Sequence, residues 1–168
     1  MAASDVASAI LLLSLCCSLA IASSSSVCRS TPQEVIIRMW VNGTEGKNIE
    51  GLGALFGGTL PIHEKEGIRL PATISQPVDC CSNLTSKLSG SITICQRGSC
   101  DFSRKAEVAQ SGGASGLLVI NTEEGGLPVI DCSNTKTLNI NIPFVVITKS
   151  DGELLSKALA GGSNDGER

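Results

Sequence analysis

The residues that most often carry hydrolytic chemistry are sparse in this sequence. His63 is the only histidine, so any Ser-His-Asp triad would have to use it as the base. No serine lies in the Gly-x-Ser-x-Gly pattern that places a nucleophile on a sharp turn. The chain has no tyrosine, which removes one class of general acid. We therefore expect no catalytic residues and no cofactor.

Cysteines are the second group of reactive side chains, and two of the eight lie in an N-terminal apolar run. Residues 10–22 (ILLLSLCCSLAIA) are fewer than the roughly 20 apolar residues that a membrane span requires, and they end in small residues. We expect residues 1–22 to be a cleaved signal peptide, followed by a serine-rich leader, residues 23–33. A signal anchor is the alternative.

Cleavage of this peptide leaves the remaining cysteines in an oxidising compartment, so disulfides are expected. The candidates are Cys28, Cys80, Cys81, Cys100 and Cys132. Cys80 and Cys81 are expected to take different partners, because a bridge between neighbours strains the peptide that joins them. We hypothesise that Cys100 pairs with Cys132, and that Cys95, inside an apolar strand, is a free buried thiol. A zinc site is the rival interpretation, but the sequence has no Cys-x-x-Cys pair, so no metal is expected.

Two sequons fit a secreted chain. Asn42-Gly43-Thr44 and Asn83-Leu84-Thr85 match the acceptor pattern for N-glycosylation, which requires an exposed segment. We expect glycans at Asn42 and Asn83.

The composition limits the remaining classes of function. The chain has 168 residues, a net charge of −3 and 2% aromatic residues, and its pI is about 5.1. One small domain is expected at this length. Because basic residues do not cluster and few aromatic side chains are present to stack on bases, we expect no nucleic-acid partner. We also expect no membrane span after residue 22.

The apolar pattern predicts a domain over residues 34–160. In its first half we predict strands over residues 34–41 and 52–60. The glycines of the second segment indicate bends or a close approach of the backbone. An edge strand is predicted over residues 68–74, where Pro71 interrupts the pattern.

The centre of the chain predicts a strand, a helix and a second strand. Residues 91–96 and 116–121 are apolar strands, and residues 101–111 carry apolar side chains on one face of a helix. Asp101 is the expected N-cap, and Gly112-Gly113 the expected C-cap. This order predicts a βαβ-like unit and a mixed α/β fold.

A last strand and helix are predicted near the C-terminus. The strand covers residues 142–148, and the helix covers residues 150–160. Ser150 or Asp151 is expected to cap the helix, and a disordered tail is expected over residues 161–168.

Two groups of motifs carry a resemblance to known proteins. The first resembles the core of a protease-associated (PA) domain: Cys95–Phe102 (CQRGSCDF), Lys105, Ala109, Gly113–Gly116, Leu118–Asn121 and Ile142-Pro143. The second resembles the lumenal N-terminal region of plant signal peptide peptidase-like proteins: Trp40–Gly43, Glu45-Gly46, Gly51-Leu52, Phe56-Gly57 and Asp79–Ser82. Together they cover roughly residues 28–160.

The resemblance implies a swivelling β-barrel or sandwich with flanking helices, placed before an intramembrane aspartyl protease module. The catalytic aspartates of that family lie in Tyr-Asp and Gly-x-Gly-Asp motifs, and neither motif occurs in this sequence. We therefore expect a non-catalytic lumenal domain that binds or gates polypeptide substrates of such a protease, as a truncated or alternative product. The expected location is the secretory pathway lumen, with endosomal or vacuolar membranes in the parent family.

Two other interpretations stay open. Plant vacuolar sorting receptors also carry PA domains, so the chain is alternatively a cargo-binding ectodomain of that kind. A secreted stand-alone PA protein is the other alternative.

The candidate peptide-binding residues are Arg97, Gly98, Ser99, Glu123 and Glu124. They lie in two segments, the turn 97–102 and the loop 122–128. The Arg97 guanidinium can donate to a peptide carbonyl or carboxylate, although it can equally pair with an acid of its own domain. The two glutamates are alternatively a solvated loop face, and calcium binding there lacks further ligands.

Overall fold

The computed structural model describes residues 28–61, 67, 69–85, 88–132 and 139–162. The expected signal peptide, residues 23–27 of the leader and His63 lie outside the described residues. Within those ranges no helix is both long enough and apolar enough to cross a membrane.

Most strands of the domain form one six-stranded sheet in the order β1-β4-β8-β7-β6-β5. These strands are β1 (Glu34–Ile37), β4 (Ile49–Gly53), β5 (Ala72–Ile74), β6 (Ile92–Gln96), β7 (Gly116–Ile120) and β8 (Phe144–Ile147). A separate hairpin pairs β2 (Trp40–Val41) with β3 (Thr44–Glu45). The expected mixed α/β fold is confirmed, and the barrel or sandwich that the resemblance implied takes the form of this sheet with a helix on each face.

The half of the sheet from β5 to β8 is parallel. β6 pairs with β5 on one side and β7 on the other, and β7 pairs with β8. β4 and β1 then continue the sheet in antiparallel pairs. Helix α1 (Phe102–Ser111) joins β6 to β7, so the predicted βαβ unit is confirmed. All five residues of β7 are buried, as expected for a strand covered on both faces.

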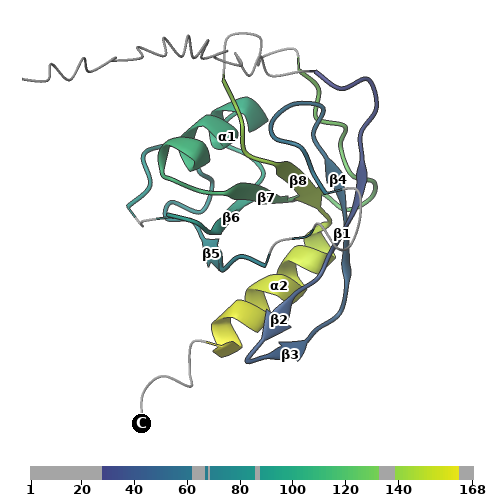
Figure 1. Ribbon diagram of the computed structural model, residues 1–168, viewed down its shortest axis with the longest axis vertical. Helices are drawn as coiled ribbons and strands as arrows, with labels where there is room; N and C mark the ends of the chain where they lie inside the picture. Colours follow the sequence, from purple (N-terminus) through teal and green to yellow (C-terminus); the bar gives the residue numbers. More distant parts are fainter. Residues whose placement is uncertain (1–27, 62–66, 68, 86–87, 133–138, 163–168) are drawn as a thin grey trace, which may run out of the picture.

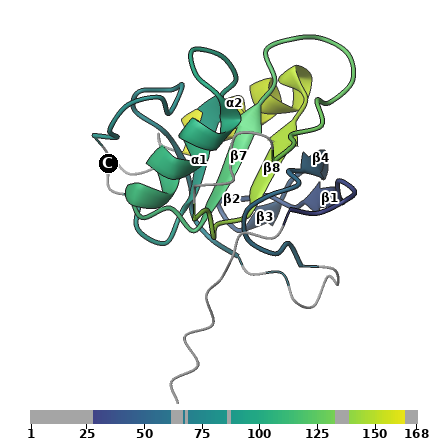
Figure 2. The ribbon, with the colours of Figure 1, turned by 90° about the horizontal axis from the view of Figure 1, so that it is seen from above.

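The two helices lie on opposite faces of this sheet (Figures 1 and 2). Side chains alternate along a strand, so Leu117 and Val119 join one apolar cluster while Leu118 and Ile120 join another. Helix α1 contributes alanines to the first cluster, and α2 (Lys149–Gly162) contributes Leu155 to the second. The continuous apolar run of β7 is therefore explained by two separate cores.

The helix ends differ in part from the prediction. Asp101 is the N-cap of α1 as expected, but its side chain makes no capping hydrogen bond. The cap of α2 is Thr148, whose hydroxyl accepts the N–H of Asp151 at 3.1 Å. Neither predicted residue is the cap, because the chain leaves β8 one residue earlier. α2 runs through Gly162, so the first two residues of the predicted tail are helical, and the rest lie outside the described residues.

The predicted strand over residues 52–60 ends at Gly53, whereas the bend and close backbone approach that its glycines indicated are confirmed. Gly57 adopts a φ of +86°, and an added Cβ there would collide with the carbonyl oxygen of Ile142. Arg29 stabilises this turn because its guanidinium donates to four carbonyls, those of residues 54, 56, 57 and 58. Backbone oxygens that a strand would pair with a neighbour are here bonded to one side chain. The predicted edge strand is shorter than expected: it begins after Pro71, as β5.

Three disulfides link the described cysteines: Cys28–Cys132, Cys80–Cys95 and Cys81–Cys100. The expectation that Cys80 and Cys81 take different partners is confirmed. The hypotheses of a Cys100–Cys132 bridge and of a free Cys95 thiol are wrong. The segment after β5 runs beside β6, where Gln96 donates its N–H to the Val78 carbonyl at 2.8 Å. This pairing brings both vicinal cysteines within reach of β6 and the turn that follows it.

Candidate functional site

The turn after β6 and the loop after β7 meet at one edge of the sheet, because parallel strands end on the same side. Arg97 donates its backbone N–H to the Ile120 carbonyl, and Asn121 donates its own to the Ile147 carbonyl, both at 2.9 Å. The two segments selected from the sequence are therefore neighbours in the fold.

Arg97 lies at the centre of this edge. One nitrogen, Nη1, donates to Oδ1 of Asn121 and to Oε2 of Glu123, each at 2.9 Å. Its guanidinium carbon lies 5.9 Å from the ring centre of Phe102. Arg97 thus pairs with an acid of its own domain. The other glutamate, Glu124, pairs with Lys149 at 3.2 Å.

Asn121 holds the Arg97 side chain in place through their hydrogen bond. Its side chain is 1% exposed, and its Nδ2 donates to the Glu123 carbonyl at 3.1 Å. Both ends of the amide are therefore used, one on the arginine and one on the loop. A buried amide with two partners holds both segments in one geometry.

The turn that contains Gly98 and Ser99 has an unusual backbone. Gly98 has a φ of +112° and Ser99 a φ of +64°. A Cβ on Gly98 would meet open space, so the glycine is required by its backbone angle and not by crowding. The Gly98 carbonyl accepts the Cys100 N–H at 2.8 Å, which closes the turn.

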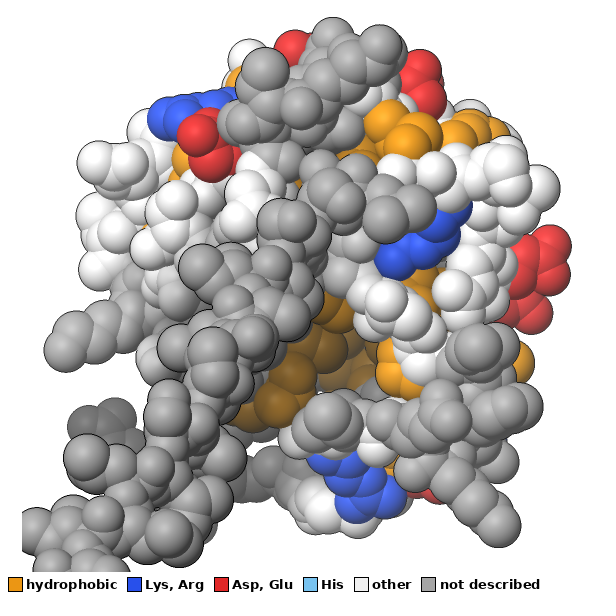
Figure 3. Space-filling model, turned by 45° about the horizontal axis from the view of Figure 1, so that its top comes forward, with side chains coloured by type: hydrophobic (Ala, Val, Ile, Leu, Met, Phe, Trp, Pro, Cys, Tyr) orange, Lys and Arg blue, Asp and Glu red, His pale blue; other side chains and the backbone are white. Residues whose placement is uncertain are grey.

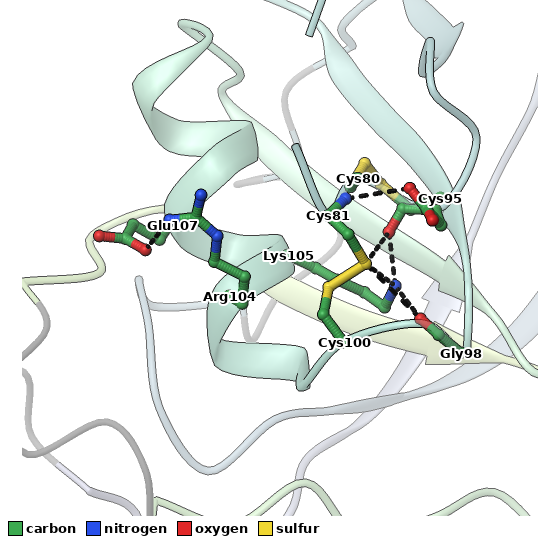
Figure 4. Close-up of a disulfide and its surroundings, with 9 residues drawn as sticks. Cys80, Cys81, Cys95, Gly98, Cys100, Arg104, Lys105 and Glu107 are labelled. Atoms are coloured by element: carbon green, nitrogen blue, oxygen red, sulfur yellow. Dashed lines mark hydrogen bonds and ion pairs between the residues drawn. A yellow bond between two sulfur atoms is a disulfide. The ribbon is translucent and has the colours of Figure 1, made fainter. Parts of the chain in front are cut away.

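Lys105 joins this turn to the segment after β5 (Figure 4). Its side chain is fully buried, and its Nζ donates to the carbonyls of Asp79 at 2.5 Å and Gly98 at 2.7 Å. The same nitrogen lies 3.4 Å from Sγ of Cys81. Burial lowers the pKa of Lys105, while the Asp79 charge acts in the opposite direction. A lysine on a helix therefore connects two loops and one disulfide.

Asp79 is the acid whose charge acts on the pKa of Lys105. Its carboxylate accepts the Cys81 N–H at 3.1 Å. That bond is the largest cause of a lowered Asp79 pKa; the Ser99 hydroxyl and the Lys105 charge also lower it. The carboxylate thus helps to hold the vicinal cysteines and the turn together.

A cavity of about 160 Å³ opens beside the start of α1. It is lined by Phe56, Asp101, Phe102, Ser103, Val129, Ile130 and Asp131. Phe56, the start of α1 and residues 129–131, in the middle of the β7–β8 connection, therefore form its walls. The lining does not include the five predicted peptide-binding residues, which lie beside it. Figure 3 shows a face with a hollow that has a hydrophobic floor, around which acidic and basic side chains are dispersed. Among the described residues, no group of three or more potential metal ligands is present.

The family model described as "PA domain" matches residues 61–155, more than half of the chain. The chain belongs to the PA-domain family. The match includes the turn, the loop and helix α1 that form the candidate site. The PA domain is a non-catalytic, protease-associated module.

Relatives of this PA domain include plant signal peptide peptidase-like proteins, as the sequence motifs predicted. Signal peptide peptidase-like 5 of Arabidopsis thaliana is 41% identical over 132 residues, which is 79% of this chain and 25% of the relative. Signal peptide peptidase-like 5 of Oryza sativa is 36% identical over 130 residues, 77% of this chain and 24% of the relative. The chain thus spans about a quarter of these relatives. Vacuolar-sorting receptor 1 of Pisum sativum is 43% identical over 77 residues, 42% of this chain and 12% of the receptor.

Solved structures share the fold of this PA domain. A zinc aminopeptidase from Bacillus subtilis superposes with a TM-score of 0.54 and 24% identity, over 76% of this chain and 30% of the enzyme chain. An aminopeptidase from Aneurinibacillus superposes with a TM-score of 0.50 and 17% identity, over 79% of this chain and 31% of the other. These likenesses show the fold alone.

Sequence reasoning missed the supporting residues of the PA-domain site. It named Asn121, Lys105 and Asp79 as parts of motifs, without a role for any of them. Two signals could have found the first two. Asn121 is a polar residue directly after a buried apolar strand, and Lys105 lies three residues after Phe102, on the apolar face of α1.

Proposed function

We propose that this PA domain is a lumenal module that binds or gates the polypeptide substrates of a plant signal peptide peptidase-like intramembrane aspartyl protease. It carries out no catalysis itself. We place the module in the lumen of the secretory pathway, at endosomal or vacuolar membranes. The disulfides and the plant relatives are consistent with a secretory location.

The cavity between the start of α1 and the β7–β8 connection is the observation that carries this proposal. Apolar side chains line part of it, namely Phe56, Phe102, Val129 and Ile130, beside the polar Asp101, Ser103 and Asp131, and Val129 is 58% exposed. About 160 Å³ is enough volume for one apolar side chain of an extended polypeptide. Burial of such a side chain supplies affinity without a requirement for one fixed sequence.

Arg97 can hold the main chain of that polypeptide beside the cavity. The hydrogen bonds to Asn121 and Glu123 both use Nη1. They fix the orientation of the guanidinium, and with it the direction of its other N–H groups. A charge-assisted bond from these groups to a peptide carbonyl orients the bound segment. In this proposal the position of Arg97 is set by Glu123, Gly98 and Ser99. Glu124 lies at the edge of the proposed binding site.

The test measures binding of fluorescent unfolded peptides by the full chain, expressed through a eukaryotic secretory pathway. We expect Val129→Asp to weaken binding at least tenfold, because a charge would replace an apolar side chain of the cavity lining. Leu154→Asp is the matched control, since Leu154 is 41% exposed on α2, the helix on the other face. Equal binding by Val129→Asp and wild type would contradict the proposal, as would cleavage of the peptides by the purified chain.

A second candidate function is cargo binding of the vacuolar sorting receptor type. The 43% identity to the pea receptor over 77 residues favours it. Both functions use the same site, so ligand choice separates them. Preference for peptides from soluble vacuolar proteins would support the receptor, and preference for lumenal segments of membrane proteins would support the protease partner.

A further inference from the structure

We propose that the Cys81–Cys100 disulfide is a thiol–disulfide exchange site, which a dithiol reductant opens by attack on Cys100 while Lys105 holds the Cys81 thiolate that leaves. This inference concerns a different chemistry from polypeptide binding and does not depend on it. It rests on the position of one buried ammonium group (Figure 4).

The ammonium of Lys105 has two strong partners and one weak one. Two of its three donors bond the carbonyls of Asp79 and Gly98. The third contact, at 3.4 Å, is Sγ of Cys81, and a disulfide sulfur accepts hydrogen bonds poorly. Cleavage of the bridge converts this sulfur into a thiolate, which is both a strong acceptor and an opposite charge. The buried cation therefore gains a full partner only in the reduced state.

This gain affects both the equilibrium and the rate of exchange. A neighbouring lysine lowers the pKa of a cysteine thiol, and a thiol of lower pKa is the better leaving group. Stabilisation of the reduced form also makes a disulfide more oxidising. Asp79 opposes the effect, because its carboxylate lies near the same cysteine and accepts the Cys81 N–H. The ammonium is in direct contact with the sulfur, so we expect its effect to dominate.

The other two disulfides have different surroundings. Cys80 and Cys95 are both fully buried, so an external thiol cannot reach their sulfurs. At the third bridge, the sulfurs of Cys28 and Cys132 contact the carbonyl oxygens of Arg29 and Leu55. Sγ of Cys81 also contacts two carbonyl oxygens, those of Asp79 at 3.4 Å and Gly98 at 3.7 Å, but both of these oxygens accept hydrogen bonds from Lys105. Both of these bridges are at least partly exposed, so the Lys105 ammonium, and not access, distinguishes the Cys81–Cys100 bridge.

The exchange balances as two displacements. One thiolate of the dithiol bonds Sγ of Cys100, the Cys81–Cys100 bond breaks, and its electron pair stays on Cys81 beside Lys105. The second thiol of the reagent then loses its proton and attacks its own mixed disulfide. Cys100 leaves as a thiolate and takes up that proton. The dithiol becomes a cyclic disulfide, and the protein bridge is reduced by two electrons.

Reduction would remove one of the covalent and hydrogen-bond links that hold the turn 97–102. The Lys105 bonds to the Asp79 and Gly98 carbonyls remain after cleavage. The adjacent Cys80–Cys95 bridge also remains, within the apolar cluster of the α1 face. We therefore expect a local change in the turn without loss of the fold.

The first experiment titrates the full oxidised chain with dithiothreitol, alkylates free thiols and maps them by mass spectrometry. We expect Lys105→Met to need at least tenfold more dithiothreitol than wild type to open Cys81–Cys100. Arg104→Met is the matched control, because this neighbouring side chain pairs with Glu107 on the helix surface and points away from the sulfurs. A folded Lys105→Met variant that opens within twofold of wild type would overturn the proposal.

A second experiment decides the matter if Lys105→Met does not fold. Cys100→Ser leaves a free Cys81 thiol, and Cys81→Ser leaves a free Cys100 thiol. Thiolate absorbance is followed against pH in both variants. We expect Cys81 to titrate at least one pH unit below the ordinary value of about 8.5 and below Cys100. A Cys81 midpoint at or above that of Cys100 contradicts the assignment.

Discussion

Arg97 Nη1 and Glu123 Oε2 lie 2.9 Å apart, although the two residues are separated by 26 positions in the sequence. The pair bridges the turn after β6 and the loop after β7. The Glu123 side chain is 71% exposed and the Arg97 side chain 29% exposed. Water therefore competes strongly at the carboxylate, and the ion pair orients the arginine more than it stabilises the domain.

Glu123→Gln should accordingly have a small effect on stability. We expect the free energy of unfolding to fall by less than about 1 kcal/mol, since an exposed ion pair contributes little. Urea denaturation of the oxidised chain measures it. Because Arg97 also bonds Asn121, Arg97→Met should cost more than Glu123→Gln. The reverse order would show that the arginine is not anchored as described.

Asn121→Ala should be more costly than Glu123→Gln. It removes a buried amide and leaves a carbonyl and part of a guanidinium without their partner. We expect a loss of about 1–3 kcal/mol in the free energy of unfolding. Thr122→Ala, at the exposed neighbour, serves as the control in the same urea titration. A loss at Asn121 no larger than that of the control would be inconsistent with its supporting role.

Gly152→Ala tests the contact between α2 and the sheet. A Cβ at this position would collide with Cγ2 of Ile120. Alanine is favoured over glycine in a helix by up to about 1 kcal/mol, but overpacking costs about 1–3 kcal/mol. We expect a net fall in melting temperature. Gly126→Ala, where a Cβ meets open space, should leave the melting temperature nearly unchanged; a stabilised Gly152→Ala would refute the close packing.

Asp79 should make stability depend on pH in the acid range. Its pKa is lowered from 3.8 in the folded chain, so the charged form stabilises the fold above that value. The contribution is lost as the pH falls below 3.8 and through the lower folded value. We expect Asp79→Asn to be less stable than wild type at pH 7. Urea midpoints of the two chains should converge on acidification, whereas a gap independent of pH would contradict this.

The two sequons should carry glycans when the chain is made in a eukaryotic secretory pathway. Asn42 and Asn83 are both exposed, and Asn42 lies with Gly43 in the tight turn of the β2–β3 hairpin, where both have positive φ. We expect treatment with a glycosidase to increase electrophoretic mobility. Asn42→Gln and Asn83→Gln should each remove one step of that shift. A chain whose mobility does not respond to the enzyme would show that neither site is used.

Local patterns in the sequence were enough to predict the βαβ unit. The period of apolar residues, the N-cap at Asp101 and the glycines after Ser111 all act within a few residues, and β6, α1 and β7 appear within one residue of their predicted bounds. The segment 54–60 was not predictable in this way. Its carbonyls bond Arg29, more than twenty positions away, and no local preference records that contact.

In the candidate site, too, local features were predictable from the sequence and long-range contacts were not. The sequence selected the turn 97–102 and the loop after β7, but it could not show that Arg97 is held by Asn121 and Glu123. Nor could it place Lys105, whose role depends on carbonyls of two separate loops. Backbone carbonyls have no sequence signature, since every residue has one.

The sequence by itself determined the family, the mixed α/β class and the oxidising chemistry of the cysteines, because these follow from residue types, short spacings and motifs. Only the tertiary structure decided which cysteines pair. Cys81 and Cys100 are bonded across 5.8 Å between Cα atoms, and Cys28 reaches Cys132 across 104 positions. A disulfide requires two Cα atoms within a narrow range of distances, and the order of strands in the sheet sets those distances.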